Sequence, residues 1–214
     1  MIITALLISC SQLHGVIIFD SYTPPNTQGG FSSGNAGGAI EVSIASDIQL
    51  TKISILNEML QSGNIRFVIY SYPQPDLLLL TESKPFSVDT VGVPTWKDSD
   101  LLSFTLNAGR EYLIGYVRDT AVNDVGDTVA ESSGGVTSNL YLHCLDGFQS
   151  PIYSHPCIEG IDFGVRLHSV PEPSICALLS ARHACSLAAG GDAPEVPMFM
   201  SSGYRGNRRQ REHP

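Results

Sequence analysis

The chain has 214 residues, of which 43% are hydrophobic, and a formal net charge of −9 at pH 7. This length accommodates one domain of about 150 residues plus terminal segments, and such a domain buries a core without metals. The acidic balance excludes nucleic acid as a partner, because phosphate contacts require clusters of Lys and Arg. Only 15% of residues are charged, and 20 Gly and 13 Pro favour short strands and turns over long helices.

The first segment, residues 1–15, is predicted to be a secretory signal peptide. An apolar run over residues 2–8 is followed by smaller and more polar residues up to Gly15, where cleavage is expected. The basic residues that usually open a signal peptide are missing, which a truncated or wrongly assigned start would explain, and a first buried strand is the alternative. Residues 7–10 also match the motif of a bacterial lipobox, in which Cys10 would carry a lipid.

Residues 16–169 are predicted to form one all-β domain, an antiparallel β-sandwich that is jelly-roll-like. Apolar and polar residues alternate with a period of two in short segments separated by turn-forming residues, which is typical of such folds. A four-leucine run at residues 77–80 predicts a buried strand, and residues 57–64 are expected to be a connection. The expected strands span residues 39–44, 48–55, 65–70, 77–82, 86–88, 102–106, 111–117, 136–142 and 161–167.

Two motifs in this region bear on chemistry. Residues 30–34 match the Gly-x-Ser-x-Gly motif of a nucleophile elbow around Ser32, but the strand and helix that must flank this motif are not expected. Trp96, the single tryptophan, would stack on a sugar ring if it is exposed, and would otherwise anchor the core or a loop. The nearby Asp98 and Asp100 have no partner segment, which argues against a glycosidase pair.

A cluster of oxygen-bearing side chains follows the strand expected at residues 111–117. It consists of Asp119, Asn123, Asp124 and Asp127, which are expected to share one loop. Carboxylate and amide oxygens at this density suit Ca²⁺, although the spacing is not that of an EF-hand. A solvated acidic loop is the alternative, and no other cofactor is expected.

Cys144 and Cys157 are predicted to form a disulfide in an exported chain. The neighbouring His143 and His155 leave a zinc site as one alternative, and free thiols as another. Adjacent His143 and Cys144 would be poor ligands for one tetrahedral ion, which favours the disulfide.

The C-terminal stretch, residues 170–214, begins with a recognisable motif. Val170-Pro171-Glu172-Pro173-Ser174 resembles the opening of the PEP-CTERM sorting signal of exported bacterial proteins. In that family the motif precedes one transmembrane helix and a short Arg-rich cluster, and an inner-membrane exosortase recognises the signal. The resemblance implies export to the periplasm, outer surface or extracellular matrix of a Gram-negative bacterium, with an exosortase-type enzyme and exopolysaccharide as partners.

The residues after the motif depart from that family pattern. Residues 175–179 are apolar, but Arg182 follows within three positions, and Gly-Gly-Asp-Ala-Pro at residues 190–194 breaks any helix. We therefore expect an irregular tail that cannot anchor the chain, and a shift of reading frame near Leu179 would explain it. The charge also changes, from a net −10 over residues 1–169 to +1 over the tail.

Residues 50–119 also resemble β modules that are common in PEP-CTERM and other surface proteins. The similarity rests on residues 50–55, 65–70 and 104–116, and it implies a β-sandwich without an assigned activity. The leading hypothesis is a non-enzymatic surface or exopolysaccharide-matrix protein. A carbohydrate-binding module built around Trp96 is the second hypothesis, and a secreted hydrolase is the third.

Overall fold

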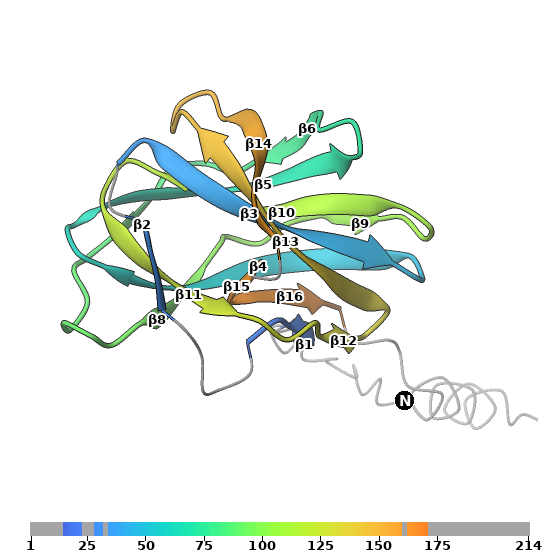
Figure 1. Ribbon diagram of the computed structural model, residues 1–214. Helices are drawn as coiled ribbons and strands as arrows, with labels where there is room; N and C mark the ends of the chain where they lie inside the picture. The colour runs from blue at the N-terminus through green and yellow to red at the C-terminus, as the bar shows by residue number, and fades with distance from the viewer. Residues whose placement is uncertain (1–14, 23–27, 32–33, 160–161, 171–214) are drawn as a thin grey trace, which may run out of the picture. The chain divides into compact units, whose positions relative to one another are not determined.

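The computed structural model describes residues 15–22, 28–31, 34–159 and 162–170. Their regular structure consists of sixteen β-strands in two eight-stranded antiparallel sheets, which face each other as two layers (Figure 1). The predicted all-β fold and its antiparallel sandwich architecture are therefore confirmed. Within the described residues no helix is long and apolar enough to span a membrane.

The first layer, sheet A, is organised around the long central strand β4 and has the path β1-β16-β4-β11-β15. Strands β8 and β9 also pair with β4, and β2 pairs with β11. The strands of sheet A are β1 (Val16–Asp20), β2 (Gln28–Phe31), β4 (Ile48–Met59), β8 (Thr95–Asp98), β9 (Phe104–Leu106), β11 (Val122–Asp127), β15 (Asp162–Phe163) and β16 (Val165–Ser169).

The second layer, sheet B, has the path β12-β13-β3-β10-β5-β6, with β14 paired to β13 and β7 to β5. Its strands are β3 (Ala36–Ile44), β5 (Gly63–Tyr72), β6 (Leu77–Leu80), β7 (Lys84–Phe86), β10 (Glu111–Arg118), β12 (Ser132–Ser133), β13 (Val136–Asp146) and β14 (Ile152–Glu159).

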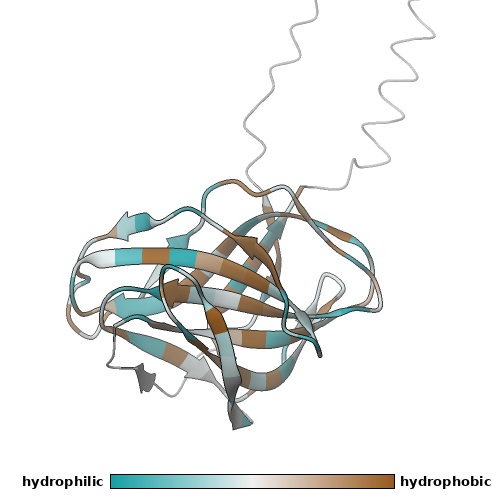
Figure 2. Cartoon of the chain, turned by 90° about the horizontal axis from the view of Figure 1, so that it is seen from above, coloured by the Kyte–Doolittle hydropathy of each residue, from teal (hydrophilic) through white to brown (hydrophobic). Residues whose placement is uncertain are grey.

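One apolar core fills the space between the sheets. Alternation with a period of two sends every second residue of a strand inward, and Figure 2 shows hydrophobic and hydrophilic positions alternating along the strands. Each fully buried large apolar side chain contributes about 1.5–3 kcal/mol to stability. Core members from sheet B include Ile40, Val42, Phe67, Ile69, Tyr112 and Ile114, and those from sheet A include Phe19, Leu50, Ile53, Ile55, Val165 and Leu167.

A second apolar cluster lies on the outer face of sheet B, beneath the β13–β14 hairpin. Phe148, in the loop between the two strands, is buried against this face together with Leu145. Arg66 Nη1 donates to the carbonyl of Gln149 at 3.0 Å, and the Tyr70 hydroxyl donates to the carbonyl of Pro151 at 3.0 Å. These hydrogen bonds hold the loop against one half of the outer face, and the loop does not cover the other half.

The predicted disulfide closes this same hairpin. Cys144 on β13 and Cys157 on β14 are joined, with their Cα atoms 5.6 Å apart and 13 positions apart in sequence. The bond ties β14 to the interior of sheet B through β13, since β14 is held by no other strand of the described residues.

Three local predictions are wrong. The leucines of β6 are half-buried or exposed, because β6 pairs only with β5 and lies at the edge of sheet B. Strand β4 continues to Met59 through the expected connection, because β11 pairs with its last residues. For the same reason the expected loop at residues 119–127 contains a strand, β11.

Replacing both Cys144 and Cys157 with Ala should lower the free energy of unfolding by about 3 kcal/mol, because the unfolded chain regains the freedom of the closed loop. Urea denaturation measures this, and wild-type protein under reductant should match the variant. Thiol titration should find two more reactive thiols after reduction in the described domain. An unchanged unfolding midpoint in both the variant and the reduced protein would contradict the structural role of the bond.

Candidate functional site

The open half of the outer face of sheet B carries a group of polar and aromatic side chains, which we call the sheet B patch. Its members are Glu41, Ser43, Tyr72, Glu111, Asn139, Tyr141, His143 and Tyr153. Glu111 lies directly opposite Ser43 on one neighbouring strand and opposite Tyr72 on the other. Because residues directly opposite each other share a face of the sheet, these three form a row across β3, β10 and β5.

Hydrogen bonds join the polar members of the patch into one network. Asn139 Nδ2 donates to Glu41 Oε1 at 2.8 Å and lies 3.1 Å from Ser43 Oγ. His143 Nε2 lies 3.2 Å from Glu41 Oε2, and Ser43 Oγ lies 3.5 Å from Glu111 Oε1. Glu41 and His143 are buried and the other members are half-buried or exposed, so this pair forms the floor of the patch.

His143 is held in its neutral form. Burial lowers the pKa of His143 below its ordinary value, although hydrogen bonding to Glu41 and its negative charge oppose the shift. A neutral imidazole with its proton on Nε2 donates to Glu41 and accepts at Nδ1 from the Tyr153 hydroxyl, 3.4 Å away. Both ring nitrogens then have partners, which orients the ring.

Tyrosine rings surround His143. The ring centroids of Tyr72 and Tyr153 lie 5.3 Å and 5.7 Å from that of His143. Strands β3 and β10 separate β5 from β13, so Tyr72 reaches across the face of the sheet to make this contact. Burial raises the pKa of Tyr72, and the negative charges of Glu41 and Glu111 raise it further, so its hydroxyl stays protonated.

A β-bulge in β13 brings Asn139 into the network. The pairing register with β3 shifts here, so that residues 139–141 stand opposite the single residue Glu41. Within the bulge Leu140 has a φ of 54°, a left-handed conformation that costs a non-glycine residue roughly 1–2 kcal/mol. Bulges and left-handed backbone of this kind concentrate at functional sites, where they redirect side chains.

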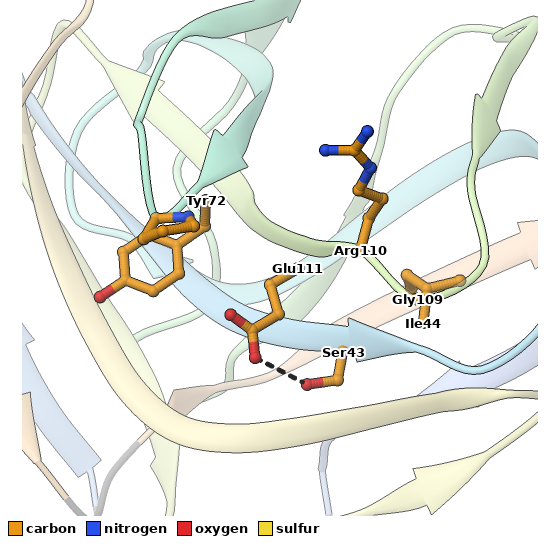
Figure 3. A pocket seen from close by; sticks show the side chains of 7 residues that line it. Ser43, Ile44, Tyr72, Gly109, Arg110 and Glu111 are labelled. Carbon is orange, nitrogen blue, oxygen red and sulfur yellow. Dashed lines mark hydrogen bonds between the residues drawn. The ribbon is translucent and has the colours of Figure 1, made fainter.

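A pocket of about 350 Å³ opens at one end of the patch. Figure 3 shows Glu111 between Tyr72 and Ser43, while the side chain of Arg110 extends in a different direction. The volume lies near the lower end of the range for small-molecule sites, roughly 300–1,000 Å³. The lining residues are Ser43, Ile44, Tyr72, Pro73, Gly109, Arg110 and Glu111.

The described members of the expected calcium cluster are not gathered at one point. Asn123 and Asp124 are successive residues of β11, so their side chains point to opposite faces of sheet A. Asp119 instead accepts hydrogen bonds from Asn64, at 2.6 Å from its backbone and 2.7 Å from its amide. The side chain of Asp127 lies outside the described part of the structure. Within the described part, no group of three or more His, Cys, Asp or Glu side chains could hold a metal ion.

Asp124 belongs to a buried polar group in the sandwich. Its carboxylate accepts a hydrogen bond from the Tyr116 hydroxyl, and it is almost fully buried. Burial raises the pKa of Asp124, although the positive charge of Arg118 acts in the opposite direction. This arrangement connects β11 of sheet A to β10 of sheet B and leaves the carboxylate inaccessible to a metal ion from solvent.

Trp96, the predicted sugar platform, is half-buried on the outer face of sheet A. The Arg166 guanidinium lies 3.7 Å from the centre of its ring, in cation–π geometry, and Arg166 Nε donates to Asp20 at 2.7 Å. The ring of Tyr22 contacts Trp96 edge-on at 6.3 Å between centroids. A sugar stacking on the face that Arg166 covers would first have to displace an ion-paired side chain.

A serine, a histidine and an aspartate also meet on sheet A. Ser54 Oγ donates to Asp98 Oδ1 at 2.6 Å and lies 2.8 Å from His168 Nε2. In a catalytic triad the carboxylate orients the histidine and the serine faces the substrate. Here the carboxylate holds the serine, which is only 1% exposed, so the arrangement suits a structural network.

Several predicted residues lie outside the described residues. These are the signal segment through residue 14, Ser32 of the nucleophile-elbow motif, the His155 side chain, and the sorting motif from Pro171 onward. Val170, the first residue of that motif, is exposed immediately after β16 ends at Ser169.

Comparison of the chain with protein-family models, with curated proteins and with solved structures gave no match. The patch therefore rests on its own geometry. Sequence reasoning missed it because Glu41, Ser43 and Glu111 occupy the polar half of alternating strands, where solvent exposure is the default expectation. The patch becomes visible only when the strand pairing is known, as in the pairing of Tyr72 with Glu111.

Lowering the pH from the ordinary histidine pKa of 6.5 toward the carboxylate range should destabilise the fold. The pKa of His143 is depressed in the folded state, so the unfolded chain binds the proton first and unfolding becomes more favourable as pH falls. Burial depresses the pKa of His168 in the same direction. Urea denaturation over this window should show a shallower decline for His143→Gln, which retains a donor and an acceptor. An identical decline in variant and wild type would contradict the buried, neutral state of His143.

Proposed function

We propose that this chain is a non-enzymatic, exported β-sandwich protein of a bacterial surface or exopolysaccharide matrix, and that its sheet B patch binds carbohydrate. The observation that carries the binding proposal is the convergence of Tyr72, Tyr153 and the Glu41–Asn139–Ser43 network around one open face. Sugars present apolar ring faces together with hydroxyl groups, and this combination of rings and polar atoms matches both.

Preorganisation supports the binding proposal. The floor residues Glu41 and His143 are buried and fixed by hydrogen bonds to Asn139 and Tyr153. All of these side chains stand on strands or on the bulge within a strand, which hold a site more precisely than flexible loops do. Little side-chain freedom then remains to be lost when a ligand binds, and the affinity is correspondingly higher.

Trp96 is a weaker candidate for the same function. Arg166 already occupies the centre of one ring face, and the polar groups nearby are paired with each other, as in the Ser54–Asp98 hydrogen bond and the Lys52–Asp98 ion pair of 2.8 Å. The open pocket with a half-buried carboxylate lies instead beside Tyr72. The geometry thus favours sheet B over the site that the sequence suggested.

The proposal of export rests on three features. The apolar N-terminal segment is typical of a signal peptide, and the Cys144–Cys157 disulfide suits an oxidising compartment. The motif that resembles a PEP-CTERM signal begins in the sequence at Val170, directly after the last strand β16 ends at Ser169. An exosortase-type enzyme is the partner that this resemblance implies.

Tyr72→Ala should weaken binding to the best ligand on a glycan array by at least about tenfold, because truncating a central aromatic anchor costs about 2 kcal/mol or more. Trp96→Ala is the matched control and should retain binding. Both variants are compared with wild type for urea stability, so that loss of fold is distinguished from loss of binding. Binding that survives Tyr72→Ala but disappears in Trp96→Ala would reject the patch in favour of sheet A.

Expression of the full chain in a Gram-negative host should yield protein in the periplasmic or extracellular fraction, with an N-terminus at Val16 and an oxidised cysteine pair. Mass spectrometry after alkylation reads both features. A chain lacking residues 1–15 is the control and should stay cytoplasmic with reduced cysteines. Retention of the uncleaved full chain in the cytoplasm would contradict export.

A further inference from the structure

The charge of the sheet B patch indicates which carbohydrates it takes. Glu111 is half-buried at the pocket. Within the described residues its carboxylate accepts one hydrogen bond, from Ser43 Oγ, which is long at 3.5 Å. None of the ion pairs within the described residues includes Glu111. Its negative charge is therefore directed into the pocket without a cation to balance it.

The second carboxylate of the patch is also not neutralised. Glu41 receives hydrogen bonds from the neutral amide of Asn139 and from His143. Burial lowers the pKa of His143, so its neutral imidazole donates a hydrogen bond to Glu41 without adding a positive charge. The two carboxylates lie on neighbouring strands two positions out of register, since Leu113 is directly opposite Glu41. Side chains in that diagonal relation are roughly 7–8 Å apart at the backbone, close enough to act on one ligand.

Arg110 is the single cationic residue that lines the pocket. It precedes Glu111 in the chain, and successive residues of extended backbone point to opposite sides. Figure 3 shows its guanidinium directed away from the Glu111 carboxylate. The space between Glu111, Tyr72 and Ser43 is consequently negative, and Arg110 stands at its rim.

The aromatic members reinforce this preference. The faces of Tyr72, Tyr141 and Tyr153 carry the negative side of the ring quadrupole, which attracts cations within about 6 Å of the ring centre. Tyrosine faces and carboxylates together favour an ammonium group, while they oppose the carboxylates of uronic acids. A hard metal ion such as Ca²⁺ would need six or more oxygen ligands, and no metal-binding group exists among the described residues.

We propose that the sheet B patch selects carbohydrate bearing free, protonated amino groups, such as glucosamine oligomers, over neutral or anionic sugars. This inference rests on the proposed carbohydrate-binding function. The ammonium group binds in the pocket beside Glu111, with Ser43 accepting a further hydrogen bond and Tyr72 contributing its ring. The rest of the sugar lies across the open face toward His143 and Tyr153.

The test compares three oligomers by isothermal titration calorimetry on the full chain: a glucosamine hexamer, an N-acetylglucosamine hexamer and a galacturonate hexamer. At a mildly acidic pH that keeps the amines protonated, the glucosamine hexamer should bind at least about tenfold more tightly than the acetylated one. Raising the salt concentration should weaken the first selectively, because salt screens charge–charge attraction. This salt series uses wild-type protein and so does not depend on any variant.

Glu111→Gln removes the charge and keeps the shape of the side chain. It should weaken binding of the glucosamine hexamer by about tenfold and leave the acetylated hexamer unchanged. The matched control is Glu82→Gln, which makes the same change in net charge at an exposed residue of a different pocket. Urea denaturation of both variants shows whether each is folded.

Each alternative outcome has a distinct meaning. Equal or tighter binding of the acetylated hexamer overturns the selection for amines and leaves the carbohydrate-binding function in place. An equal loss of affinity for the glucosamine hexamer in Glu82→Gln and Glu111→Gln also overturns the selection for amines, because the attraction would then come from the overall charge of the protein. If none of the three oligomers binds, the inference and the proposed binding function both fail.

Discussion

The uninterrupted pairing of β3, β10 and β5 is the constraint on which the rest of the molecule depends. Strand β10 pairs with both neighbours over eight residues each, without a shift in register. This register sends Tyr112, Ile114 and Tyr116 into the core and turns Glu111 outward in line with Ser43 and Tyr72. A slip of one residue would exchange the two faces, expose the core and bury the patch, so the stability of the core also specifies the site.

The patch includes features that oppose folding, and the surrounding structure compensates for them. Buried Glu41 and His143 lose hydration, and Leu140 adopts a left-handed backbone. Hydrogen bonds within the network, the apolar cluster under Phe148 and the disulfide of the β13–β14 hairpin stabilise the same region. Local strain and buried polar groups surrounded by such support are typical of a preorganised binding site.

Much of the fold was predictable from the sequence, and the candidate site was not. Along strands such as β3, β5 and β10, residues of the apolar core alternate with residues of the outer face, so the period of two indicates both the strand and its inward side. Prediction from alternation is wrong where tertiary contacts decide the structure. The polar residues Asn123 and Asp124 predict a loop where β11 lies, and the leucines of β6 predict a buried strand although β6 lies at a sheet edge. The patch depends on strand order and on a bulge at residues 139–141, and neither leaves a local signal. The sequence singles out Trp96 as the one tryptophan, but it does not show that Arg166, on a strand far along the chain, stacks on its ring.

In the proposed function the ligand binds to the outer face of sheet B. The most direct measurement is an NMR titration of isotope-labelled protein with the oligosaccharide that binds best, following backbone and tyrosine signals. We expect the largest changes in chemical shift on β3, β10 and β13 around Glu41, Glu111 and His143, together with Tyr72. Changes concentrated around Trp96 and Arg166 on sheet A, with the sheet B signals unmoved, would contradict it.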